Sequence, residues 1–259
     1  MSGRERDNGL NKQIYYGDSC PPVIRRGMEL AADLLWPPRC PLCDKVRPFG
    51  QDVLCPGCGK KLPFVKQPWC MCCGRQMEED DEEYCFACRR QARSFDRGKI
   101  IFLYEGDLRE SVLRMKFHNR RDYIPFYARE MAREAETFLA QCAPQAFVPV
   151  PMHPKKRRAR GFDQSLLLCR AMTRETGIET RSGLVVRTRN TLPSKALGAD
   201  ERRRNLRGAF APGSGAVPER VMIIDDIFTT GATMGEVARV LKLGGAKHVT
   251  FLALCGVRA

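Results

Sequence analysis

The sequence predicts an α/β fold in which helices flank a largely parallel sheet, preceded by a small Cys-rich domain. Three observations support this prediction. Four CxxC pairs lie between residues 40 and 88. From about residue 98, apolar strand-like runs alternate with helical stretches, a pattern typical of parallel sheets covered by helices. One such run, Val221–Ile224, is followed by two aspartates and a Thr/Gly loop, the place where open α/β sheets bind ligands.

The individual elements follow from short apolar runs and from helical periodicity. The expected strands are Ile100–Tyr104, Ala146–Val150, Leu184–Arg187, Val221–Ile224 and His248–Leu254. The expected helices lie near Asp107–Phe117, Ile124–Cys142, Gln164–Thr176 and Gly231–Leu243. An irregular basic stretch follows Arg187. The last helix has Met234, Val237 and Leu241 on one face and ends at Gly244-Gly245, which favours a C-cap.

We expect three segments along the chain. Residues 1–22 form a polar lead that is expected to be disordered. Residues 23–92 hold a short helix that begins near Ile24, followed by the Cys-rich module. Residues 93–259 form the α/β domain.

Composition narrows the class of protein. The chain is 43% hydrophobic and 29% charged, as in ordinary soluble globular proteins. No apolar run approaches the roughly 18 residues of a membrane span, and the N-terminus lacks a signal peptide's apolar core, so we expect a cytoplasmic protein. The net charge is +14, or about +10 if eight cysteines bind two Zn²⁺ as thiolates. This excess indicates an anionic partner, either phosphate-rich small molecules or nucleic acid.

Eight paired cysteines predict two metal sites. They are Cys40, Cys43, Cys55, Cys58, Cys70, Cys73, Cys85 and Cys88. Successive pairs begin fifteen residues apart, so the region has the pattern of a duplicated unit. Two thiolates three positions apart on a tight turn reach one metal, and two such knuckles complete a tetrahedral Cys₄ site that suits Zn²⁺.

The two zinc ions are expected to be structural, because an all-cysteine site leaves no open position for catalytic water. A disulfide or iron–sulfur arrangement is the alternative. Sequential pairing of the knuckles is the simpler arrangement, but the uniform spacing also permits an interleaved one. Cys72, inside one knuckle, is interpreted as a spare thiol, and its exchange with a neighbouring ligand is the alternative. Cys142, Cys169 and Cys255 lie among apolar neighbours and are expected to be small buried hydrophobes.

The stretch Val221–Thr233 (VMIIDDIFTTGAT) predicts a phosphate-binding site. Its first four residues form a buried parallel strand, and Asp225 and Asp226 lie at the C-terminal end of that strand. Backbone N–H groups and threonine hydroxyls at the start of the following helix can cradle a phosphate, and Gly231 permits close backbone approach. The adjacent carboxylates suit a ribose diol, directly or through Mg²⁺. An isolated Asp-Asp pair would more simply cap a helix, but the whole pattern favours ligand binding.

This stretch resembles the signature with which type I phosphoribosyltransferases bind 5-phosphoribosyl-1-pyrophosphate (PRPP). The resemblance implies a type I phosphoribosyltransferase-like sheet, with Asp225 and Asp226 on the ribose 2′- and 3′-hydroxyls and residues 229–233 around the 5-phosphate. The PRPP-binding residues that it implies are Asp225, Asp226, Thr229, Thr230, Gly231, Ala232 and Thr233. It also implies Mg²⁺ bound together with PRPP.

Further motifs resemble the ComF/GntX family, in which a double zinc ribbon precedes this domain. Val148–His153 (VPVPMH), then basic residues, then Arg160–Ser165 (RGFDQS) are similar to that family's PVP…RGFNQ stretch. Asp163 stands in place of the more usual Asn. The resemblance implies a pyrophosphate loop in this region, formed by Met152, His153, Lys155 and Arg160.

Shorter matches extend the resemblance to about residues 23–259. Arg202–Phe210 (RRRNLRGAF) carries Arg202 and Asn205 at the family's arginine and asparagine positions. Lys116-Phe117 resembles its LKF stretch. Ser194 is a departure, because the family commonly has glutamine eleven residues before that asparagine.

The resemblance implies a PRPP-binding protein that transfers or senses a phosphoribosyl group with Mg²⁺. Whether it is an enzyme stays open, and no catalytic residue is assigned, since lone histidines such as His118 and His153 are more simply structural. The alternative is a protein that handles single-stranded DNA in natural competence and DNA uptake, in contact with the uptake machinery, for which PRPP is a regulator. A zinc-ribbon scaffold with a degenerate domain is a third interpretation, against which the intact DD…TTGAT pattern argues.

Overall fold

The computed structural model describes residues 37–47, 53–78, 82–191 and 199–259. The expected polar lead and the helix near Ile24 lie outside these residues. The chain divides into two compact units, residues 1–62 and 63–259. The second half of the Cys-rich module therefore belongs to the same compact unit as the sheet, whereas the sequence suggested a boundary at residue 92. No helix among the described residues is both long and apolar enough to cross a membrane.

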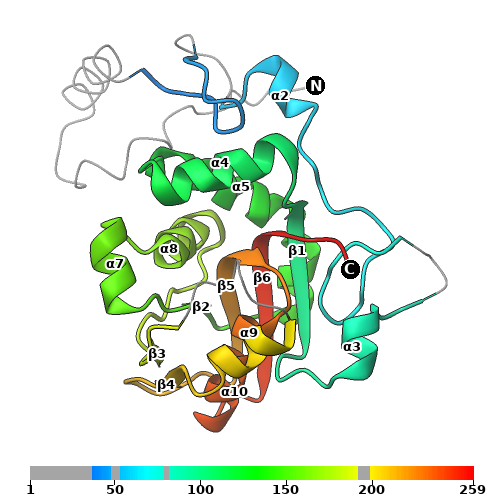
Figure 1. Cartoon of the computed structure of the whole chain (residues 1–259), viewed down its shortest axis with the longest axis vertical. Helices are drawn as coiled ribbons and strands as arrows, with labels where there is room; N and C mark the ends of the chain where they lie inside the picture. Colours follow the sequence, from blue (N-terminus) through cyan, green and yellow to red (C-terminus); the bar gives the residue numbers. More distant parts are fainter. Residues whose placement is uncertain (1–36, 48–52, 79–81, 192–198) are drawn as a thin grey trace. The chain divides into compact units, whose positions relative to one another are not determined.

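The second unit is built on a four-stranded parallel sheet, and the predicted fold class is confirmed. Its strands are β1 (Arg97–Leu103), β2 (Ala146–Pro149), β5 (Arg220–Phe228) and β6 (His248–Gly256), in the order β1-β6-β5-β2 (Figure 1). Because all four run in one direction, their carboxyl ends meet at one edge of the sheet. A separate antiparallel pair joins β3 (Val185–Arg187) to β4 (Phe210–Pro212).

Helices connect and cover the strands (Figure 1). The helices of this unit are α3 (Phe86–Arg90), α4 (Gly106–Phe117), α5 (Ile124–Glu134), α6 (Glu136–Cys142), α7 (Pro154–Arg160), α8 (Gln164–Thr176), α9 (Ala199–Leu206) and α10 (Ala232–Leu243), with a short 3₁₀ turn, η2 (Arg121–Tyr123). The single helix expected at residues 124–142 is two helices, because the backbone leaves helical geometry at Ala135 (φ −99°, ψ 5°). Neither Gly nor Pro stands there, so the sequence carried no signal for this break.

Two helices, α7 and α9, fall where the sequence predicted loop or irregular structure. None of the seven residues of α7 is buried, so the helix has no apolar stripe that periodicity could reveal. It is instead set by its start, where Pro154 occupies the first helical position and the His153 side chain accepts a hydrogen bond from the amide of Lys155.

The core on one face of the sheet joins α10 to the second half of the Cys-rich module. Alternate residues of β5, among them Ile223, pack in a cluster with the apolar face of α10. The rings of Phe228 and Phe251 stack with centroids 4.8 Å apart, and Phe95 meets Phe251 edge-on at 4.8 Å. Cys70, Cys73, Cys85 and Met77 belong to the same cluster. This part of the module is therefore built into the core of the sheet.

Two of the three cysteines that follow the Cys-rich module fill the core as predicted. Cys169 and Cys255 are fully buried, and burial raises the pKa of both thiols well above the ordinary range. Cys142 is half-buried at the end of α6, so it is only partly the buried hydrophobe that was expected.

Candidate metal centres and phosphate-binding site

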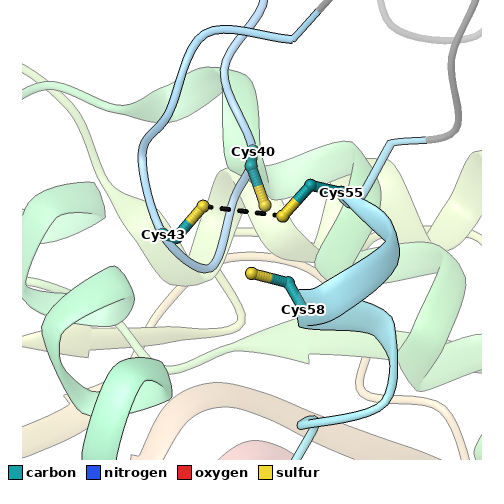
Figure 2. A group of neighbouring side chains, drawn as sticks. All are labelled: Cys40, Cys43, Cys55 and Cys58. Carbon is teal, nitrogen blue, oxygen red and sulfur yellow. Dashed lines mark hydrogen bonds between the residues drawn. The ribbon is translucent and has the colours of Figure 1, made fainter.

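The eight paired cysteines form two clusters of four sulfurs. Cys40, Cys43, Cys55 and Cys58 make the first cluster, and Cys70, Cys73, Cys85 and Cys88 make the second, with the sulfurs in each within 4.8 Å of one another. In the first cluster all four side chains point toward a common centre, and Cys43 and Cys55 are 3.7 Å apart (Figure 2). The knuckles therefore pair sequentially, not in the interleaved way. Each set offers four thiolates and fits a structural Zn²⁺.

The two clusters share one backbone design, as expected of a duplication. In the first cluster, the amide of Asp44 donates to the carbonyl of Cys40 at 2.9 Å. In the second cluster, the amide of Gly74 donates to the carbonyl of Cys70 at 2.8 Å. Asp44 and Gly74 both have positive φ, 62° and 69°. They differ in their surroundings, because a Cβ on Gly74 would lie only 2.6 Å from the carbonyl oxygen of Gly98 in β1. Only glycine fits where the second ribbon meets the sheet.

Hydrogen bonds in the second cluster favour thiolates. The amide of Cys73 donates to the sulfur of Cys70 at 3.5 Å, and Arg75 donates to the sulfur of Cys85 at 3.2 Å. The contact between Cys70 and Cys73 lowers the pKa of Cys70 to about 6 and raises that of Cys73, so the two thiols share one proton between them. Because zinc binds the thiolate form, the donors from the Cys73 amide and from Arg75 suit the metal.

The two aspartates of the predicted phosphate-binding site lie inside β5, near the carboxyl edge of the sheet. Both are buried, Asp225 to 9% exposure and Asp226 to 4%. The hydroxyl of Ser165, on α8, donates to Oδ1 of Asp225 at 2.7 Å. The ammonium of Lys116, on α4, forms an ion pair with Oδ2 of Asp226 at 2.9 Å. Three elements remote in sequence therefore converge on this carboxylate pair.

The electrostatics of this pair are unbalanced. Burial, and then the charge of Asp226, raise the pKa of Asp225 to about 7. Burial by itself lowers the pKa of Lys116, but the negative charge of Asp226 has the larger combined effect, so the pKa of Lys116 is raised. Among the described residues, the one ion pair to these carboxylates is that of Lys116 with Asp226. The site therefore lacks positive charge, a condition that a bound cation would relieve.

The loop between β5 and α10 forms the second half of the predicted site. Gly231 has φ of 78°, and a Cβ there would lie 2.9 Å from the ring of Phe228, so the position requires glycine. The hydroxyl of Thr230 accepts a hydrogen bond from the amide of Ala232 at 3.4 Å, and the amide of Gly235 donates to Gly231 at 2.8 Å. We call Thr229–Thr233 the phosphate loop. It leads directly into the 12-residue helix α10.

The predicted pyrophosphate loop begins beside the same carboxylates. Asp163 caps α8 by accepting from the amide of Leu166 at 3.1 Å, and its other oxygen accepts from the amide of Met152 at 3.3 Å. Both oxygens are thus acceptors, which explains why Asp serves here in place of Asn. Burial is the main cause that raises the pKa of Asp163, and the charge of Asp226 adds to it, so the two carboxylates lie close enough to interact.

The remaining predicted pyrophosphate-loop residues lie at or within α7. His153 is the N-cap of that helix, which is a structural role, and burial and neighbouring cations lower its pKa. Lys155 is exposed. Arg160 donates to the side chain of Gln164, and its guanidinium lies over the ring of Phe117, 5.2 Å from the centroid. Ser194 and the side chain of Arg202 lie outside the described residues.

Three functional candidates were not assigned from the sequence. Lys116 and Ser165 occur in stretches that carried the family resemblance, Lys116-Phe117 and RGFDQS, but nothing in those stretches indicated their partners. The third is Arg93, whose guanidinium donates to the carbonyl of Thr230 in the phosphate loop at 3.2 Å. No motif indicated Arg93, because it lies 137 residues away from its partner.

Known proteins resemble both parts of the chain. A family model described as a double zinc ribbon domain matches residues 31–89. Competence protein F of Haemophilus influenzae is 31% identical over 162 residues, which cover 60% of this chain and 71% of that protein. The DNA utilization protein YhgH of Escherichia coli K12 is 32% identical, covering 59% and 68%. A hypoxanthine phosphoribosyltransferase structure from Trypanosoma cruzi aligns with 53% of this chain and 79% of its own, at 11% identity and a TM-score of 0.33.

Proposed function

This chain belongs to the ComF family, and from that premise we propose that its carboxylate pair and phosphate loop bind PRPP together with Mg²⁺. The observation that carries the proposal is the buried pair Asp225 and Asp226, compensated by one ammonium and followed directly by a glycine-containing loop at a helix start. Carboxylates are ligands that Mg²⁺ prefers, and amides at a helix N-terminus bind phosphate.

Each part of the site would hold a different part of PRPP. Asp225 and Asp226 would accept the ribose hydroxyls, directly or through Mg²⁺, which also supplies the missing positive charge. The amides and hydroxyls of the phosphate loop would hold the 5-phosphate. Met152, His153, Lys155 and Arg160 would face the pyrophosphate, and the two Cys₄ ribbons would hold structural Zn²⁺. The domain organisation that we propose is a double zinc ribbon before a phosphoribosyltransferase-like domain.

This arrangement suits either transfer or sensing of a phosphoribosyl group. In transfer, a nitrogen base or ammonia attacks C1 of the ribose, the C1–O bond breaks, and pyrophosphate takes the bonding electron pair. Positioning and electrostatic stabilisation of the departing pyrophosphate would carry most of the catalysis. Release of pyrophosphate that depends on one acceptor would identify a transferase, and saturable binding without release would identify a sensor.

A calorimetric titration of the zinc-loaded protein with Mg²⁺ and PRPP tests the proposal. We expect saturable binding by the wild type and at least about a 100-fold loss in an Asp225→Asn/Asp226→Asn double variant, because each buried carboxylate loses its charge-assisted contacts. Glu219→Gln is the matched control, since Glu219 precedes the opposite end of β5 and pairs with Lys247 on the surface. Folded wild-type protein that does not bind PRPP would overturn the proposal.

A groove beside β1 favours a second function, the binding of single-stranded nucleic acid. Its volume is about 480 Å³, and Trp69, Arg97, Lys99 and Phe138 are among the residues that line it. Lys99 lies over the ring of Trp69 at 5.4 Å, and Arg97 over that of Phe138 at 5.6 Å. No ion pair to either cation is found among the described residues. Phe138 is buried in the wall of the groove, so Trp69 is the ring that a base would reach, and Arg97 and Lys99 would meet the phosphates beside it.

The groove brings together residues that the sequence keeps apart. Aromatic residues are not interleaved with the basic runs of the chain, so no stacking platform was evident from the sequence. The fold assembles one from the second ribbon, strand β1 and helix α6. We propose that this groove, and not the phosphate loop, would contact DNA in a competence-related role.

Fluorescence anisotropy with a labelled oligothymidylate tests the second function. We expect Trp69→Ala to weaken binding about 10-fold, because stacking on an aromatic ring contributes roughly 1–3 kcal/mol per base. Lys99→Ala should weaken binding and lower the slope of log affinity against log salt by about one. Lys247→Ala, which removes a lysine paired with Glu219, is the control. Equal affinities of Trp69→Ala and wild type would exclude the groove as the binding site.

A further inference from the structure

Arg93 joins the second zinc ribbon to the phosphate loop. It lies five residues after Cys88, the last cysteine of the second cluster. Its Nη1 donates to the carbonyl of Thr230 at 3.2 Å and is 3.5 Å from the position that a Cβ on Gly231 would take. Its Nε is buried with no hydrogen-bond partner among the described residues. The guanidinium therefore lies directly against the backbone of the phosphate loop.

The segment that carries Arg93 is anchored on both sides. On one side lies α3, with Cys85 at its N-cap and Cys88 within it, and both cysteines belong to the second cluster. On the other side, Phe95 is 2% exposed in the core, and the carboxylate of Asp96 accepts from the amide of Val249 at 2.8 Å. The position of the guanidinium is thus set by the ribbon and by the sheet, and not by the loop that it contacts.

The contact with Thr230 also orients an amide of the loop. The carbonyl of Thr230 and the N–H of Gly231 belong to one planar trans peptide, so they point in opposite directions. When Arg93 holds the carbonyl toward itself, the amide of Gly231 points away from Arg93. This amide lies at the start of α10, and no acceptor for it is found among the described residues, so it can donate to an anion.

We propose that Arg93 is a positioning residue through which the second ribbon sets the geometry of the phosphate loop, so that the affinity for the 5-phosphate of PRPP depends on this side chain. The choice of PRPP as the ligand rests on the proposed function, whereas the contact between Arg93 and Thr230 is independent of it. It gives the second ribbon a role in ligand binding beyond its contribution to folding.

The first test is a titration of zinc-loaded Arg93→Ala with PRPP and Mg²⁺. We expect an affinity about 10-fold or more below that of the wild type, since a charge-assisted hydrogen bond is lost. Arg93→Lys, which keeps the charge and one donor, should recover part of the loss. Arg90→Ala is the control, because Arg90 lies on α3 with its guanidinium over the ring of Phe86, 4.6 Å from the centroid. Wild-type affinity in Arg93→Ala would overturn the proposal.

The second test needs no ligand and separates this inference from the proposed function. The amide of Gly235 is bonded to the carbonyl of Gly231 and reports the order of the loop and the first turn of α10. We expect hydrogen exchange at this amide to be about 10-fold faster in Arg93→Ala and unchanged in Arg90→Ala. If exchange is faster in Arg93→Ala but the wild type does not bind PRPP, the coupling between the ribbon and the loop stands and PRPP is rejected as the ligand. Unchanged exchange would reject the coupling.

Discussion

Replacement of Cys73 by serine is expected to unfold the unit that carries the sheet, whereas the same change at Cys40 leaves that unit folded. Both cysteines are fully buried. Cys73 shares a core cluster with Phe95, Ile100 and Phe228, so its zinc site and the sheet stabilise each other. Structural zinc contributes roughly 10–16 kcal/mol in small domains, which exceeds the stability of most proteins. Cys40 belongs to the other compact unit.

Thermal unfolding followed by circular dichroism, together with the zinc content per chain, checks this expectation. The wild type should release two zinc ions, and Cys40→Ser should keep one and retain the main unfolding transition. Cys73→Ser should lose that transition or shift it by tens of degrees. A Cys73→Ser protein that unfolds like the wild type would show that the sheet does not depend on the second ribbon.

Asp225→Asn is expected to stabilise the protein at pH 8 while it removes PRPP binding. Asp225 and Asp226 are both buried, and the ion pair with Lys116 goes to Asp226, so an ionised Asp225 is costly. Asparagine keeps an oxygen that accepts from Ser165 and removes the charge. We expect a gain of about 2 kcal/mol at pH 8, or several degrees in Tm.

The stability gained by Asp225→Asn is expected to depend on pH. The pKa of Asp225 is about 7 in the folded protein against an ordinary value of 3.8. The folded state therefore retains a proton that the unfolded state releases, so the stability that this group contributes is complete below about pH 4 and is lost as the pH rises through 7. The gain from Asp225→Asn should accordingly be about 1 kcal/mol larger at pH 8 than at pH 6.

Thermal melts of the two single asparagine variants provide the control. Asp226→Asn removes the ion-pair partner of Lys116 and should be less stable than Asp225→Asn at every pH, because an unpaired buried charge is costly. If Asp225→Asn is less stable than the wild type at pH 8, the carboxylate is not strained by burial. A stabilised variant that has lost its ligand would show that the acidic pair is kept for binding at the expense of stability.

The parts of the site that the sequence predicted are those encoded locally. The CxxC pairs and the DD…TTGAT stretch hold their chemistry within a few residues, and the structure places both in the expected kind of element. Ser165 and Arg93 reach their partners across 60 and 137 residues, and no local spacing reveals such contacts. Likewise, uniform spacing of the cysteines could not decide how the knuckles pair, whereas the distances between the sulfurs do.

The secondary structure that the sequence missed has a physical reason in each case. Helix α7 buries none of its residues, and α9 (ADERRRNL) has too few apolar residues for a stripe, so periodicity gave no signal for either. The strand β5 extends four residues beyond Ile224 and includes both aspartates, and Asp225 pairs with Ala253 of β6 although it is an acidic residue. A carboxylate inside a strand has low propensity, and tertiary contacts override it.

The glycine at position 74 makes the two ribbons non-interchangeable, although they arose from one repeated pattern. Asp44 occupies the equivalent turn in the first copy with the same backbone conformation. A first-copy sequence grafted into the second position would bring a side chain into the space filled by the carbonyl of Gly98, 2.6 Å from its Cβ. The turn of the first ribbon therefore carries a side chain, whereas the turn of the second ribbon leaves no room for one against strand β1.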